Sequence, residues 1–181
     1  MRKAIAAVAL AGAVSFAQAA ATPSPYTGHE SRDIKSLSTE DVDALLAGKG
    51  MGFAKAAELN GYPGPAHVLE LASEFGLTDE QRARTQALFA SMQSKAKLLG
   101  EALVVEERRL DRLFAGKSIT PEKLSASLAA IGALQAKVRG VHLEAHLAQV
   151  AILTPDQVER YSSLRGYAAG HDPSSHGSHR H

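Results

Sequence analysis

The stretch His142-Leu-Glu-Ala-His146-Leu-Ala-Gln-Val-Ala-Ile-Leu153-Thr154-Pro155-Asp156-Gln157 decides the fold, because one helical pattern ends in it and another begins. Its last five residues have the pattern Leu-Thr-x-x-Gln, which also occurs at 77–81. The two copies lie at either end of the most strongly periodic part of the chain. The sequence therefore predicts that a helix begins at each copy.

Each copy has the chemistry of a capping box. The threonine hydroxyl can accept a hydrogen bond from the backbone N–H of the glutamine, and the glutamine side chain can reach back to the threonine N–H. A cap of this kind contributes about 1 kcal/mol to helix stability, so the motif needs no ligand to explain it. The residues that define the boxes are Leu77, Thr78 and Gln81 in the first copy and Leu153, Thr154 and Gln157 in the second.

The sequence between the boxes predicts a long helical hairpin. One helix is expected from 79 to 115, where Gly116 ends it, and a second from Thr120-Pro121 to 152. A third helix is expected from Thr154 to about 169. The expected apolar stripes are Leu88, Met92, Leu99, Leu103, Leu110 and Phe114 on the first helix and Leu124, Leu128, Ile131, Val138 and Val141 on the second. An eleven-residue spacing of Leu88, Leu99 and Leu110 favours a nearly straight helix.

The N-terminus has the pattern of a secretory signal peptide. A basic start at Arg2 and Lys3 precedes an uncharged apolar run, and Ala17-Gln18-Ala19 fits the small-x-small rule for cleavage. Residues 1–21 are therefore expected to be removed on export. The apolar run is too short for a permanent membrane span.

Residues 22–37 are expected to form an extended arm, because they contain Pro23 and Pro25 and have no periodicity. The helical domain is expected to cover residues 38–169. Short helices are predicted after Ser38, over 53–59 and over 65–75, with a glycine-rich turn at 48–52.

Composition excludes several classes of protein. The chain has no Cys, which removes disulfides, thiolate metal sites and a cysteine nucleophile. Cleavage of the signal removes two of the 20 Lys and Arg residues and leaves 18, against 19 Asp and Glu. This balance gives no general attraction to nucleic acid. No nucleophile–base constellation supports an enzyme.

Two histidines four residues apart are candidate metal ligands. His142 and His146 can point to the same side of the helix, and five helical turns place them in line with Leu124 and Leu128. Imidazoles on such a stripe need partners, and Zn, Cu, Ni or Co would suit them. The further ligands would come from His67, Glu70 and Glu74, or from His29 in the arm. The alternative is that both histidines bond to acids or backbone and simply pack.

The C-terminal segment 170–181 is rich in histidine and has no apolar residue to bury, so we expect it to be disordered. Four of its histidines are candidate weak ligands for the same metals: His171, His176, His179 and His181. A solvated tail without function is the alternative.

The export signal, the all-helical pattern and the two Leu-Thr-x-x-Gln boxes together resemble the Spy/CpxP family of periplasmic proteins. The resemblance covers about residues 65–168. It implies a bent helical hairpin, all-α, with shorter helices packed on it and a cradle-like homodimer. It also implies an ATP-independent chaperone or envelope-stress protein that binds unfolded clients or a membrane sensor protein. The alternative within the family is a heavy-metal sensor or resistance protein. Two features depart from the family pattern: the charges on the long helix are balanced, and residues 38–64 are additional.

Overall fold

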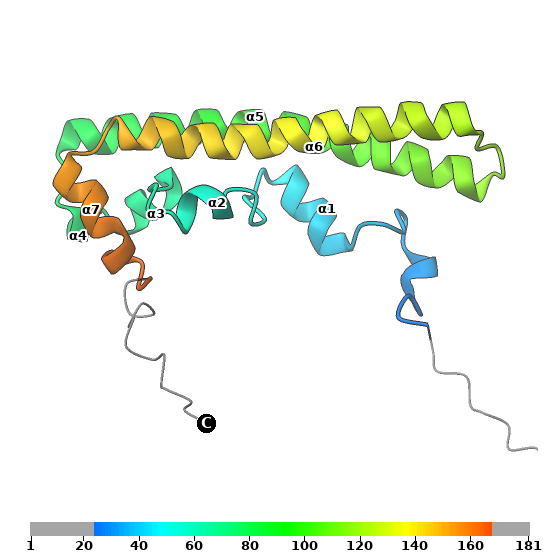
Figure 1. Ribbon diagram of the computed structural model, residues 1–181, viewed down its shortest axis with the longest axis horizontal. Coiled ribbons are helices and arrows are strands. Elements are labelled where there is room, and N and C mark those ends of the chain that lie inside the picture. Colours follow the sequence, from blue (N-terminus) through cyan, green and yellow to red (C-terminus); the bar gives the residue numbers. More distant parts are fainter. Residues whose placement is uncertain (1–23, 168–181) are drawn as a thin grey trace, which may run out of the picture.

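The computed structural model describes residues 24–167, and this part of the chain is all-helical, with no strand. The two long helices lie side by side, and the short helices lie beneath them (Figure 1). The α-helices are α1 (Thr39–Leu46), α2 (Lys55–Glu58), α3 (Pro65–Glu70), α4 (Ala72–Phe75), α5 (Asp79–Ala115), α6 (Pro121–Val150) and α7 (Pro155–Leu164). A short 3-10 helix, η1 (His29–Ser31), precedes them. The all-α prediction is confirmed.

Helices α5 and α6 run antiparallel as an almost straight hairpin (Figure 1). The expected bounds of α5 are confirmed at both ends, from the capping box of Thr78 and Gln81 to Gly116. Helix α6 begins behind Thr120, whose side chain accepts a hydrogen bond from the N–H of Lys123. It ends at Val150, two residues before the expected end.

All the short helices lie on one side of the hairpin, which leaves its other side open (Figure 1). Helix α1 approaches α5 so closely that the carbonyl group of Leu45 lies against Gly100. A Cβ at Gly100 would lie 2.8 Å from the carbonyl carbon of Leu45. The glycine, expected from sequence to be a mild weakness in a long helix, is therefore the docking point of α1.

Two apolar clusters hold the short elements on the hairpin. One lies under α1 and the arm, where Ile34 and Leu45 pack on Leu103, Val104 and Ile131. The other lies at the end where α5 begins, and there α4 and α7 pack together. Its buried residues are Val68, Phe75, Leu153 and Tyr161.

Several details differ from the sequence-based expectations. The helix expected over 65–75 is interrupted at Leu71 (φ −105°, ψ 27°), which separates α3 from α4. Helix α7 ends at Leu164, about one turn earlier than expected. The arm is not simply extended: within residues 24–37 it forms turns and η1, and Ile34 is only 2% exposed. Its Lys35 pairs with Asp111 and its Asp33 with Arg108 of α5.

Two residues of the expected apolar stripes are largely uncovered. Leu128 is 53% exposed and Phe114 is 50% exposed, whereas Leu103, Ile131 and Val138 are buried as expected. Both exposed residues lie near the α5–α6 turn, beyond the reach of the short helices. Helical periodicity predicts which side of its helix each residue lies on. It does not predict whether another element covers that side.

None of the helices within residues 24–167 is long and apolar enough to cross a membrane. The expected signal peptide (1–21) and the histidine-rich tail (170–181) lie outside the described residues.

Candidate functional site

The two Leu-Thr-x-x-Gln boxes meet in space and join their glutamines. Gln81 Nε2 donates to Gln157 Oε1 at 2.8 Å, and Gln157 Nε2 donates to Gln81 Oε1 at 3.2 Å. Each glutamine oxygen also accepts from the threonine N–H of its own box, at 3.1 Å from Thr78 and 2.9 Å from Thr154. We call this four-residue arrangement the glutamine clasp.

The glutamine clasp also satisfies backbone carbonyls at the ends of the preceding segments. Gln81 donates to the Ile152 oxygen and Gln157 to the Phe75 oxygen. Because the polar side chains are largely buried, each lost partner would leave a buried group without a hydrogen bond. The two boxes are therefore coupled, and the clasp ties the start of α5 to the start of α7.

A cavity of about 410 Å³ lies between the hairpin and the segment from 48 to 67. A glycine-rich loop, 48–52, forms one wall, and α5 and α6 form the other. The candidate residues His67, His142 and His146 all line it. Sequence reasoning singled out these histidines, but it did not predict the cavity.

His142 is 4% exposed and stacks on Phe53, with ring centroids 6.1 Å apart. Its Nε2 atom is buried and has no hydrogen-bond partner within residues 24–167. Burial, and secondarily the neighbouring His146, lower the pKa of His142 below its usual value. This imidazole is therefore neutral near pH 7.

His146 is 8% exposed and is fixed through one ring nitrogen. Its Nδ1 lies 2.8 Å from the backbone oxygen of Tyr62, and since a carbonyl can only accept, Nδ1 carries the proton. In the neutral ring, Nε2 then carries the lone pair. Gly64 packs directly on this ring, because a Cβ there would lie 3.0 Å from Nε2.

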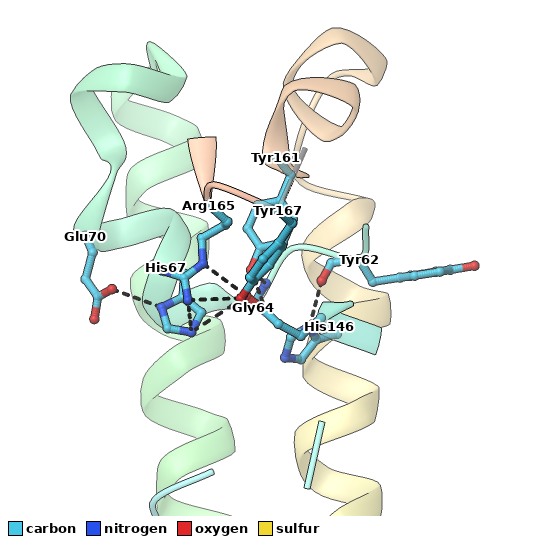
Figure 2. A network of polar contacts seen from close by, with 9 residues as sticks. Tyr62, Gly64, His67, Glu70, His146, Tyr161, Arg165 and Tyr167 are labelled. Atoms are coloured by element: carbon cyan, nitrogen blue, oxygen red, sulfur yellow. Dashed lines mark hydrogen bonds and ion pairs between the residues drawn. The ribbon is translucent and has the colours of Figure 1, made fainter. Parts of the chain in front are cut away.

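His67 and Glu70 belong to a different network, which Figure 2 shows. His67 Nδ1 lies 2.9 Å from Glu70 Oε2, and its Nε2 lies 3.2 Å from Arg165 Nη2. Both nitrogens of His67 are thus engaged, one as donor and one as acceptor. The structure does not place His67 or Glu70 as free ligands beside the pair on α6.

At the centre of this network is Glu58, whose side chain is 13% exposed. It accepts from Tyr161 at 2.5 Å, from Tyr167 at 2.8 Å and from Arg165 at 3.0 Å. Burial tends to raise the pKa of Glu58, but these three donors outweigh it and hold the pKa below its usual value. Burial and then Glu58 raise the pKa of Tyr161. This network fastens α7 to α2.

The Glu58 network predicts acid-sensitive stability. A carboxyl group with a lowered folded-state pKa stabilises fully above its unfolded-state pKa, about 4.5, and the contribution is lost as pH falls through the folded-state value. We expect the free energy of unfolding, measured with urea, to fall between pH 6 and pH 3. Glu58→Gln should cost about 3 kcal/mol at pH 7 and flatten this pH dependence. Glu74→Gln, at an exposed position on α4 outside this network, is the control and should change neither the stability at pH 7 nor its pH dependence. An unchanged profile in Glu58→Gln would refute the prediction.

Among the described residues, His142 and His146 are the only two of the candidate metal ligands that lie together with a free ring nitrogen. Within residues 24–167, no group of three or more His, Asp or Glu side chains is arranged to hold a metal. His29 belongs to η1. The arm that contains η1 lies at the opposite end of the hairpin from α3 (Figure 1). Glu74 is exposed on α4. The tail histidines His171, His176, His179 and His181 lie outside the described residues.

Comparisons with known proteins identify no relative: no family model, no curated protein and no solved structure matches this chain. The functional conclusion therefore depends on the geometry and the sequence patterns.

Sequence reasoning missed Glu58, Tyr161 and Arg165. Glu58 sits in a short helix among alanines, and 103 residues separate it from Tyr161. The spacing of Tyr161 and Arg165, one helical turn apart, places them on the same side of α7. No local signal indicates that this side meets a carboxylate.

Proposed function

We propose that this protein is an exported, ATP-independent chaperone or envelope-stress protein of the Spy/CpxP type, which binds unfolded clients in the periplasm. The observation that carries the proposal is the open side of the hairpin, where large apolar side chains are exposed. Leu98 is 65% exposed, Val105 58% and Leu147 60%. Together with the exposed Ala129 and Ala133, these residues define what we call the open face.

The positions of these residues around the helices support this choice. At about 100° per residue, Leu98 and Val105 lie about 160° and 140° around α5 from Gly100, which touches α1. Leu147 lies about 140° around α6 from His142, which faces the short helices. The open face is therefore on the opposite side from the short helices. Apolar side chains that no other element of residues 24–167 covers suit transient contact with the apolar segments of an unfolded chain.

Charged residues lie between the apolar ones on the same surface. Lys95, Glu101 and Arg109 are exposed on α5. Mixed charge keeps the surface well hydrated and gives no long-range preference for clients of either sign. A homodimer would join two such hairpins and enlarge the binding surface; we propose this arrangement as part of the function. A membrane sensor protein is the alternative partner.

Aggregation assays test the proposal. The mature chain, 22–181, should suppress light scattering by a chemically denatured client at stoichiometric ratios without ATP. Replacing Leu98, Val105 and Leu147 together by Ser should raise the amount needed at least tenfold, because each site loses about 1.5–3 kcal/mol of possible apolar burial. Leu46→Ser with Leu59→Ser is the matched control, since these side chains are 41% and 64% exposed but lie off the open face. A mature chain that does not slow aggregation at any ratio would refute the proposal.

Transition-metal binding is the second candidate, and the orientation of His146 favours it. The Tyr62 carbonyl fixes the proton on Nδ1 and leaves the Nε2 lone pair for an ion, as outer partners do in metal sites. Zn, Cu, Ni or Co could bind here with other donors, or at the tail.

Calorimetric titration distinguishes these metal sites. If the pair on α6 is a metal site, the chain with residues 170–181 deleted takes up one ion, and His142→Ala with His146→Ala abolishes that uptake. Loss of all binding on deletion of the tail alone would show that the pair on α6 is not a site.

A further inference from the structure

We propose that the cavity beside His142 binds a small amphiphilic carboxylate, a molecule with an apolar body and one terminal carboxylate group. This inference goes beyond client binding, which we place on the opposite side of the hairpin. The cavity volume of about 410 Å³ lies within the range of about 300–1,000 Å³ that is usual for small-molecule sites.

The inner wall of the cavity suits an apolar body. Phe89 and Met92 contribute from α5, and Ala54, Pro65 and Ala66 contribute from the facing segment. Of these, Pro65 is buried and the other four are half-buried. An alkyl chain bound here would be transferred out of water, and it would not displace a polar group that is already hydrogen-bonded.

The rim of the cavity carries uncompensated positive charge. Lys49 and Lys55 line it and are exposed, and neither forms an ion pair or side-chain hydrogen bond within residues 24–167. Among the described residues, Glu58 is the one carboxylate in the lining, and its oxygens already accept from Tyr161, Tyr167 and Arg165. An anionic group is therefore the complement that this rim lacks.

The glycine-rich loop, 48–52, places its backbone beside the imidazole ring of His142. Gly50 lies over His142, because a Cβ there would be 3.9 Å from Nδ1. That nitrogen has no hydrogen-bond partner within residues 24–167, so it is free to bond to a carboxylate oxygen when it carries the proton. The next residue, Met51, has a φ of 43°. A left-handed conformation is costly for a methionine and is held where the surroundings impose it.

A dication is a poorer occupant of this cavity. It would meet two lysines at the rim, and the part of the lining within residues 24–167 has no free carboxylate to offset its charge. An alkyl carboxylate gains from the lysines and from the apolar wall at once. Zinc is therefore the competing outcome in the test.

Calorimetry and NMR on the full mature chain, 22–181, in EDTA test the proposal with octanoate and decanoate. We expect a dissociation constant of about 10–100 µM, with decanoate binding more tightly, and intermolecular NOEs from the alkyl chain to the Met92 methyl group. Octyltrimethylammonium, which has the same body and the opposite charge, should bind at least tenfold more weakly.

Two lysine double variants make the result specific. Lys49→Gln with Lys55→Gln should weaken octanoate binding at least tenfold, and Lys95→Gln with Lys137→Gln, at exposed hairpin positions, should leave it unchanged. All four positions are exposed, and thermal melting checks that each variant is folded. Binding that is absent at millimolar octanoate, equal for the ammonium probe or insensitive to Lys49 and Lys55 would overturn the proposal. So would a chain that takes up zinc in the cavity, shown by shifts at His142 in metal-containing buffer, but no carboxylate.

Discussion

Gly100→Ala should destabilise the protein by about 3 kcal/mol, although alanine is the better helix former. A Cβ at this position would overlap the carbonyl group of Leu45, and the overlapping atoms belong to backbone that cannot rotate away. To relieve the overlap, α1 must move off α5, and Leu45, now 4% exposed, must lose part of its packing. Urea unfolding and thermal melting measure the change; for a domain of this size it corresponds to roughly 10 °C in Tm.

Gly132→Ala is the matched control, because this glycine also lies inside a long helix and nothing within residues 24–167 lies within 4 Å of the position that a Cβ would occupy. Only the higher helix propensity of alanine then affects stability, so the substitution should stabilise the protein by about 0.5–1 kcal/mol. The two substitutions should therefore have opposite signs. If Gly100→Ala stabilises as Gly132→Ala does, α1 is not docked where the structure places it.

The glutamine clasp predicts strong coupling between two sites 76 residues apart. Gln81→Ala and Gln157→Ala should each cost about 2–3 kcal/mol, because each leaves the partner amide and buried backbone groups without hydrogen bonds. The double variant should cost about 1–2 kcal/mol less than the sum, since the second change removes a group that has already lost its partner. A double-mutant cycle by urea unfolding measures this coupling.

Thr120→Ala provides the control for the cycle, because this cap of α6 makes only a local bond to the N–H of Lys123. It should cost about 1 kcal/mol and add to Gln81→Ala within about 0.5 kcal/mol. Additivity of Gln81→Ala and Gln157→Ala would mean that the boxes act as two independent caps, contrary to the structure.

Local signals in the sequence were sufficient to predict the long elements. Thr78 and Gln81 start α5, Gly116 ends it, and Thr120 with Pro121 starts α6, because capping depends on residues within one turn. The same signals predicted both capping boxes. They carried no information that the boxes face each other, since that contact depends on how the chain returns after α6.

For the candidate site, helical phase was informative but incomplete. It correctly placed His142 and His146 on one side of α6, and both are buried. It also placed Leu128 in line with His146, yet Leu128 is 53% exposed, because the segment that covers the histidines does not extend that far. Contacts made across long separations, such as Glu58 with Tyr161 and Leu45 with Gly100, were beyond prediction from patterns of neighbouring residues.

The most direct test of the proposed function is where an unfolded client touches the hairpin. A photoreactive amino acid placed in turn at Leu98, Val105 and Leu147 on the open face, and at Leu46 and Leu59 off it, can be crosslinked to a denatured client. All five positions are more than 40% exposed, so accessibility alone does not favour one set. Client binding on the open face predicts strong crosslinks at the first three positions and weak ones at the other two. Equal crosslinking at all five positions, or crosslinks at Leu46 and Leu59 alone, would contradict it.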